Sequence, residues 1–104
     1  MKCLKAGLLA VAGLMLAWSG LASAADAING GKLYARYCEN CHGGDGAGRI
    51  PGAPDFSRGE RMLQPDSTLV DSIKNGMGMM PAYRGQLTTK ELFDLTAYLR
   101  TLRR

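Results

Sequence analysis

A chain of 104 residues is long enough for one domain and no more. It carries 13 basic and 9 acidic residues, which gives a formal net charge of +4 at pH 7. Two of the basic residues, Lys2 and Lys5, fall in a predicted signal peptide, which leaves 11 basic and 9 acidic residues and a charge of +2. A charge this small does not suggest nucleic acid as a partner, and we expect none.

Residues 1–24 show the three parts of a secretory signal peptide. Lys2 and Lys5 supply a positive start, a long uncharged run follows, and Ala24 ends a small-x-small triplet of the kind that signal peptidase cleaves. The alternative is a retained membrane anchor, because about 20 apolar residues span a bilayer, but glycine and serine dilute this run. We predict cleavage after Ala24, export to the periplasm and a mature domain of residues 25–104, with membrane attachment only if the segment is retained.

The mature domain carries helical patterns separated by long loops. Apolar residues at helical spacing predict a first helix over residues 27–41. The stretch 43–59 is rich in glycine and contains two prolines, which predicts a loop. A second helix is expected over residues 66–75, with Asp66 as its N-cap and Gly76 in the left-handed position after its end.

The last helix has the clearest signals. Thr88 and Glu91 fit a capping box, and leucines repeat at helical spacing after them, at Leu92, Leu95, Leu99 and Leu102. No strand pattern is present, so the fold class is predicted to be all-α. A domain this small with two long loops needs a disulfide framework, a metal or a cofactor to complete its core, and we expect a large apolar prosthetic group.

The sequence Cys38-Glu39-Asn40-Cys41-His42 is a C-x-x-C-H motif, typical of covalent haem attachment. Two thiols separated by one helical turn can add to the two vinyl groups of a porphyrin. The adjacent histidine then faces the iron. We predict one covalently bound haem c, with Cys38 and Cys41 forming thioethers and His42 as the proximal iron ligand.

Three other interpretations of these cysteines are weaker. A redox dithiol usually accompanies a β-α-β pattern, which is absent. A structural zinc needs four ligands, whereas the mature domain has two cysteines and one histidine. A plain disulfide leaves His42 unexplained.

The second axial ligand of the iron is expected in the loop of residues 77–85, which contains Met77, Met79 and Met80. A thioether is a soft ligand suited to haem iron, and methionine ligation raises the reduction potential. Methionines also serve as ordinary apolar filler, so the residues alone leave the choice open.

The chain resembles the class I c-type cytochromes. The resemblance rests on the C-x-x-C-H motif, on the run Cys-His-Gly-Gly-Asp-Gly that begins at Cys41, and on Met80-Pro81-Ala82-Tyr83 before the last helix. It implies a small cytochrome c fold over residues 25–104, with three to four helices and long loops wrapped around one covalent haem. It also implies that Met80 is the distal ligand and that the two other methionines pack around the haem.

The resemblance implies two further roles. The carbonyl of Pro54 is expected to accept a hydrogen bond from Nδ1–H of His42, which would fix the ring orientation. Gly30 is expected to allow close crossing by the last helix near Leu95 and Tyr98.

A haem ligated on both faces suits electron transfer better than substrate binding, so we do not expect an enzyme. The predicted function is that of a monomeric periplasmic one-electron carrier that docks transiently with a redox donor and a redox acceptor, respiratory or other. The alternatives are a dedicated subunit of an oxidoreductase complex and a gas-binding or catalytic haem protein. Four arginines in the loops are interpreted as scattered surface charges, with steering towards an acidic partner as the alternative: Arg49, Arg58, Arg61 and Arg84.

Overall fold

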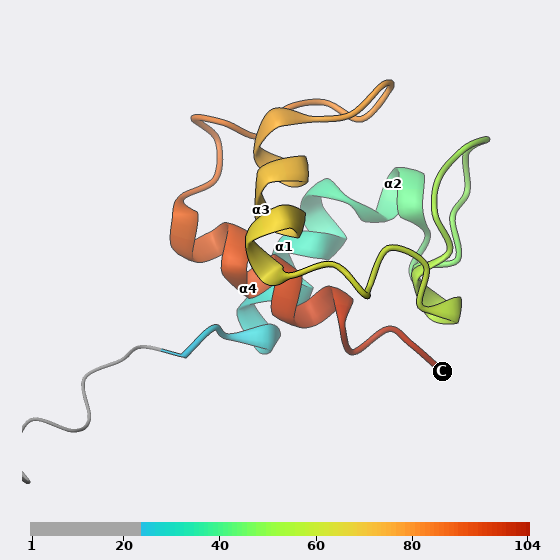
Figure 1. Ribbon diagram of the computed structural model, residues 1–104, viewed down its shortest axis with the longest axis horizontal. Helices are drawn as coiled ribbons and strands as arrows, with labels where there is room; N and C mark the ends of the chain where they lie inside the picture. Colours follow the sequence, from blue (N-terminus) through green and yellow to red (C-terminus); the bar gives the residue numbers. More distant parts are fainter. Residues whose placement is uncertain (1–23) are drawn as a thin grey trace, which may run out of the picture.

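The computed structural model describes residues 24–104, so nearly all of the predicted signal peptide lies outside the described residues. This part of the chain forms four α-helices and one short 3-10 helix (Figure 1). They are α1 (Ala27–Tyr37), α2 (Glu39–His42), η2 (Phe56–Arg58), α3 (Asp66–Asn75) and α4 (Thr89–Leu99). Between residues 24 and 104 there are isolated β-bridges but no strand, which confirms the all-α prediction. None of these helices combines the length and hydropathy that crossing a bilayer demands.

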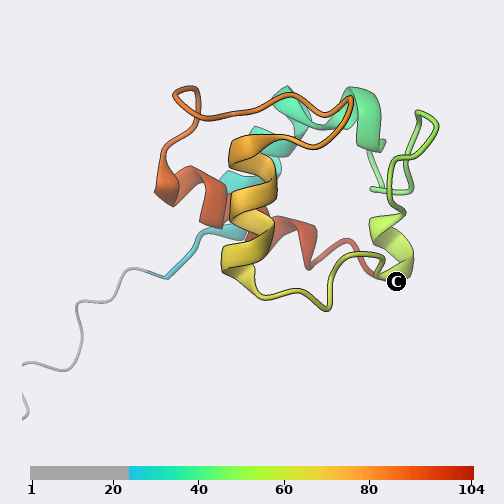
Figure 2. The ribbon, with the colours of Figure 1, turned by 45° about the horizontal axis from the view of Figure 1, so that its top comes forward.

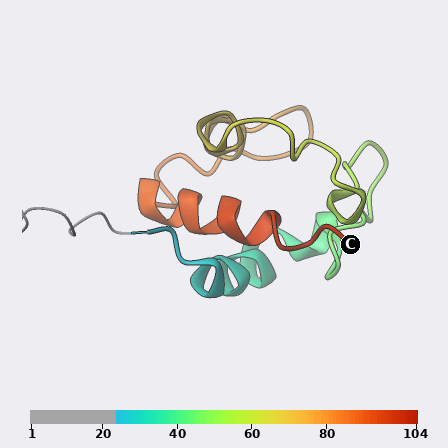
Figure 3. The same cartoon turned by 60° about the horizontal axis from the view of Figure 1, so that its bottom comes forward.

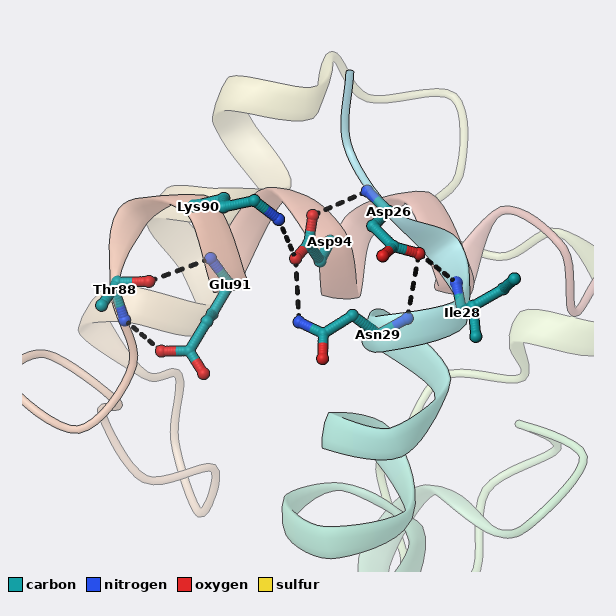
Figure 4. Close-up of polar contacts among 7 residues, drawn as sticks. All are labelled: Asp26, Ile28, Asn29, Thr88, Lys90, Glu91 and Asp94. Carbon is teal, nitrogen blue, oxygen red and sulfur yellow. Dashed lines mark hydrogen bonds and ion pairs between the residues drawn. The ribbon is translucent and has the colours of Figure 1, made fainter. Parts of the chain in front are cut away.

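Helix α4 is the centre of the fold and packs between α1 and α3 (Figure 3). Its capping box forms as predicted, because Thr88 Oγ1 accepts from the Glu91 N–H while the Glu91 carboxylate accepts from the Thr88 N–H (Figure 4). Its leucines enter a core of ten buried apolar residues: Tyr34, Phe56, Met62, Leu69, Val70, Ile73, Leu87, Leu92, Leu95 and Leu99.

The crossing of α1 and α4 depends on Gly30. A Cβ placed on this glycine would lie 2.0 Å from the carbonyl oxygen of Asp94 and 2.9 Å from Cβ of Tyr98. No other residue fits without separating the helices, so the expected close crossing is confirmed. Beside it, the rings of Tyr34 and Tyr98 pack with their centroids 5.1 Å apart.

The predicted helix over residues 27–41 is interrupted at Cys38, where the chain turns between α1 and α2. In an unbroken helix the carbonyl of Tyr37 would accept from the Cys41 N–H. Instead it accepts from the hydroxyl of Tyr83, at 2.9 Å, and the Cys41 N–H donates to the carbonyl of Cys38. The prediction of one helix was therefore wrong, because a distant tyrosine takes the carbonyl that would have continued it.

Helix α3 has the predicted bounds, but the prediction that Asp66 is its N-cap was wrong. Pro65 is the capping position and Asp66 is the first helical residue. The Asp66 carboxylate instead pairs with the guanidinium of Arg100, at 2.6 Å. Gly76 follows the helix with φ of 76°, a positive value that favours glycine, but its ψ of 167° lies outside the left-handed helical conformation that was predicted. The predicted loop of residues 43–59 contains η2, capped by the side chain of Asp55.

A buried carboxylate holds the start of α1 against α4. The Asp94 carboxylate accepts hydrogen bonds from the Asp26 N–H at 2.7 Å, from Asn29 Nδ2 at 2.9 Å and from Lys90 Nζ at 2.8 Å (Figure 4). Burial on its own would raise the pKa of Asp94, but these three donors together hold that pKa below its usual value of 3.8. Its folded pKa is thus lower than its unfolded pKa. This contribution to stability is therefore complete above the unfolded pKa and is lost as the pH falls through the folded pKa.

We expect Asp94→Asn to lower the free energy of unfolding by about 2 kcal/mol at pH 7, because charge-assisted hydrogen bonds are removed from a buried site. The difference from wild type should shrink as the pH falls below 3.8, the range in which the wild-type carboxylate protonates. Urea unfolding at a series of pH values measures both effects. Asp71→Asn, at an exposed position in α3, is the matched control. Equal stability of the two variants at pH 7 would contradict the role assigned to Asp94.

Candidate functional site

A cavity of about 420 Å³ is lined by residues of α2, α3 and the loops that follow them. Figures 1 and 2 show how these elements are arranged. The cavity brings together residues that the sequence places far apart, from the turn before α2, from the loop of residues 43–59 and from the loop after α3. All five predicted site residues line it: Cys38, Cys41, His42, Pro54 and Met80. Most of its other lining residues are apolar.

The two cysteines lie on one side of the cavity, at the start and near the end of α2. Both are free thiols; Cys38 is half-buried and Cys41 is exposed. Burial, and secondarily the neighbouring Cys41, raises the pKa of the Cys38 thiol to about 11. Within residues 24–104, no three histidine, cysteine or acidic side chains gather in a metal-binding cluster.

The imidazole of His42 has a buried nitrogen, Nδ1, with no hydrogen-bond partner among the described residues. Its ring stacks on Phe56, with centroids 4.9 Å apart and planes at 24°. Burial lowers the pKa of His42, which favours the neutral imidazole that binds metals. The expected bond from Nδ1 to the Pro54 carbonyl is not formed in this structure, although Pro54 lines the same cavity.

Met80 is placed by a tight hairpin. Its N–H donates to the carbonyl of Met77 at 2.8 Å, and the Met77 N–H donates to the carbonyl of Met80 at 3.2 Å. Gly76 lies so close that a Cβ there would be 2.7 Å from the carbonyl oxygen of Met80. Met80 packs against the core, whereas Met77 is 53% and Met79 85% exposed. The structure therefore distinguishes Met80, which packs against the core, from Met77 and Met79, which are exposed. The sequence alone does not make this distinction.

Two tyrosines that were given no role by the sequence analysis hold the walls of the cavity together. The hydroxyl of Tyr83 donates to the carbonyl of Tyr37, which links the methionine loop to α1. The hydroxyl of Tyr34 donates to the carbonyl of Gly43, directly after His42. The run Met-Pro-Ala-Tyr was a signal for Tyr83, but its partner lies 46 residues away and is visible only in the fold.

Arg61 also borders the cavity, and its side chain is exposed, which agrees with its interpretation as a surface charge. It lies in the segment between η2 and α3. Its place in the cavity wall depends on how that segment folds, for which the sequence carries no motif.

The residues present fit a covalently bound porphyrin iron. Two free thiols, a neutral imidazole and a core-packed thioether line one largely apolar cavity. The two thiols can add to the vinyl groups of the porphyrin. The imidazole nitrogen and the thioether sulfur can both ligate the iron, so every group that haem c requires is present.

Comparisons with known proteins agree with this donor set. A family model described as cytochrome C oxidase, cbb3-type, subunit III matches residues 25–99. Cytochrome c6 of Leptolyngbya boryana is 32% identical over 72% of this chain and 91% of its own length. Cytochrome c6 of Nostoc sp. is 28% identical over 88% of this chain and 85% of its own length.

Two further matches differ in how much of the relative they cover. The cbb3-type cytochrome c oxidase subunit FixP of Bradyrhizobium sp. is 34% identical over 74% of this chain but only 28% of its own length. Among solved structures, the KustC0563 c-type cytochrome superposes with a TM-score of 0.66 at 30% identity, covering 72% of this chain and 98% of that one.

Proposed function

This chain belongs to the family matched by the cbb3-type subunit III model, within the class I mono-haem c-type cytochromes that carry covalently bound haem c, and we propose that it is a free periplasmic one-electron carrier. The similarity to proteins named cytochrome c6 supports an electron-transfer role rather than enzymatic turnover. Beyond family membership, we propose that the protein is located in the periplasm, that it diffuses freely, and that five residues have specific roles at the haem site.

Cys38 and Cys41 are the residues proposed to hold the haem through thioethers. His42 is proposed as the proximal iron ligand and Met80 as the distal one. Pro54 is proposed as a wall residue of the same pocket, and its carbonyl accepts no bond from His42 Nδ1 in this structure. The haem supplies an iron that alternates between the ferrous and ferric states. The position of all five residues around one cavity supports this assignment.

The protein's own part in electron transfer is to keep the site unchanged between the two redox states. The hairpin at Met80 and the bond from Tyr83 to Tyr37 hold the distal loop in place. The largely apolar lining of the cavity disfavours water around the haem. Little reorganisation then opposes the transfer of an electron. Cys41 is exposed, so the edge of the site beside it is accessible to a docking partner.

The observation that favours a free carrier is the similarity to cytochromes c6, which extends over 91% of the length of one of them. The similarity to FixP extends over 28% of that protein's length. The description of the matched family and the similarity to FixP favour the second candidate, a dedicated electron-transfer subunit of an oxidoreductase complex.

Size-exclusion chromatography of the protein from a periplasmic extract tests the proposal. We expect a monomer whose ferrous form does not bind carbon monoxide at neutral pH, because Met80 occupies the sixth position of the iron. Stoichiometric co-elution with an oxidoreductase would favour the subunit. Rapid and complete binding of carbon monoxide would contradict electron transfer through a six-coordinate haem.

A further inference from the structure

The imidazole ring of His42 is oriented by packing in this structure. The backbone of this residue is fixed, because its N–H donates to the carbonyl of Cys38 at 3.0 Å and its carbonyl accepts from the Gly48 N–H at 2.7 Å. At its buried Nδ1, however, the ring has no hydrogen-bond partner among residues 24–104 that could restrain it. The orientation of the ring therefore depends on the side chains that touch it.

Phe56 covers one face of this ring. The centroids of the two rings lie 4.9 Å apart and their planes are inclined by 24°, as in other stacked aromatic pairs. Phe56 is 7% exposed and belongs to the buried core, so its ring is not free to move away. The imidazole cannot turn about its Cβ–Cγ bond without colliding with a ring that lies against its face. The stack therefore fixes the plane of the imidazole.

The backbone that carries Phe56 is also held. The Phe56 N–H donates to the carbonyl of Gly46 at 2.8 Å, and the Arg104 N–H donates to the carbonyl of Ser57 at 2.9 Å. A Cβ on Gly46 would lie 3.1 Å from Cβ of Phe56 and 2.9 Å from Cδ1 of Leu102. Residues 102–104 thus pack against η2 and the loop before it, and Figures 1 and 3 show this end of the chain beside η2.

We propose that Phe56 is a positioning residue for the proximal iron ligand, which fixes the plane of the His42 imidazole and lowers the reduction potential of the haem. This inference rests on the proposed haem site and gives a role to a residue outside its five members. Neighbours that orient a ligating histidine also tune the metal that it binds.

The direction of the effect follows from the charge on the imidazole. The face of an aromatic ring is electron-rich and attracts positive charge. An imidazole bound to ferric iron carries more positive charge than one bound to ferrous iron. The ring of Phe56 therefore stabilises the ferric state more than the ferrous state, which lowers the potential.

Phe56→Leu and Phe56→Met are the principal test, because both keep an apolar side chain but lack an aromatic face. We expect both holoproteins to keep their covalent haem. Their ferric forms should show changed g values in electron paramagnetic resonance spectra, because these values depend on the plane of the axial imidazole. A potentiometric titration should give both a higher reduction potential than wild type. Phe56→Tyr, which retains the ring face, should have wild-type values of both quantities.

Two controls separate this role from general packing. Phe93→Leu makes the same substitution in α4, at a residue that does not line the cavity, and should change neither quantity. Leu99→Ala removes a buried core side chain that does not line the cavity either. It should lower the stability to urea while leaving the g values and the potential unchanged.

The proposal is overturned if Phe56→Leu and Phe56→Met keep the wild-type g values, or if their potentials do not rise. It is also overturned if Leu99→Ala reproduces their shifts, since loss of packing would then be the cause. Failure of the wild-type protein to carry covalent haem would instead overturn the proposed function, so the two failures are distinguishable.

Discussion

The Met80→Ala variant is expected to keep its covalent haem but to lose the methionine-to-iron charge-transfer band of the ferric protein. Its reduction potential should fall by a substantial part of the roughly 0.8 V range that axial ligands span, because a thioether favours the ferrous state. The ferrous variant should also bind carbon monoxide, since the sixth position is then open. Visible spectra and a potentiometric titration measure these effects.

Met79→Ala is the control for this experiment. Met79 is 85% exposed and lies in the same hairpin, so its removal should leave the charge-transfer band and carbon monoxide binding unchanged. A band that survives in Met80→Ala would contradict the assignment and move it to one of the neighbouring methionines. The core packing and backbone bonds of Met80 are the structural reasons for expecting the first result.

Gly30→Ala is expected to destabilise the holoprotein by about 2–3 kcal/mol, the usual cost of inserting atoms into a close-packed contact. The sign is opposite to that expected from helix propensity, which favours alanine over glycine by about 1 kcal/mol. The new Cβ would lie 2.0 Å from a backbone oxygen of α4, and neither helix can yield without opening the core. Urea unfolding of the ferric protein gives the free energy of unfolding.

The neighbouring glycine supplies the control. A Cβ on Gly31 would lie 3.1 Å from the ring of Tyr98, a side chain that can move by a few tenths of an ångström. Gly31→Ala should therefore stay within about 1 kcal/mol of wild type, because the propensity gain offsets the contact. Equal stability of wild type and Gly30→Ala would show that the crossing is looser than the structure describes.

Elements defined by local chemistry could be predicted from the sequence. The capping box at Thr88 and Glu91 needs only residues three apart, and the leucines after it needed only their spacing, so α4 forms as expected. The bounds of α3 followed in the same way. The residues around His42 could be proposed as a site from the sequence, because covalent haem attachment requires two cysteines and a histidine at fixed spacing, and the structure places all three beside one cavity.

Features that depend on distant partners could not be predicted. The break at Cys38 follows from a hydroxyl 46 residues away, and Asp66 is diverted from capping by an arginine 34 residues later. The position of Arg61 depends on a backbone angle that its residue type disfavours. In the first two cases a tertiary hydrogen bond overrode the local preference on which the prediction rested.

The mass of the protein purified from the periplasm of a host that matures c-type cytochromes tests the central claim most directly. We expect the mass of residues 25–104 plus one haem, retained after acidic organic extraction because thioether bonds do not dissociate. The same measurement tests cleavage after Ala24. A colourless protein with the mass of the bare polypeptide, or a haem that extraction removes, would contradict the account.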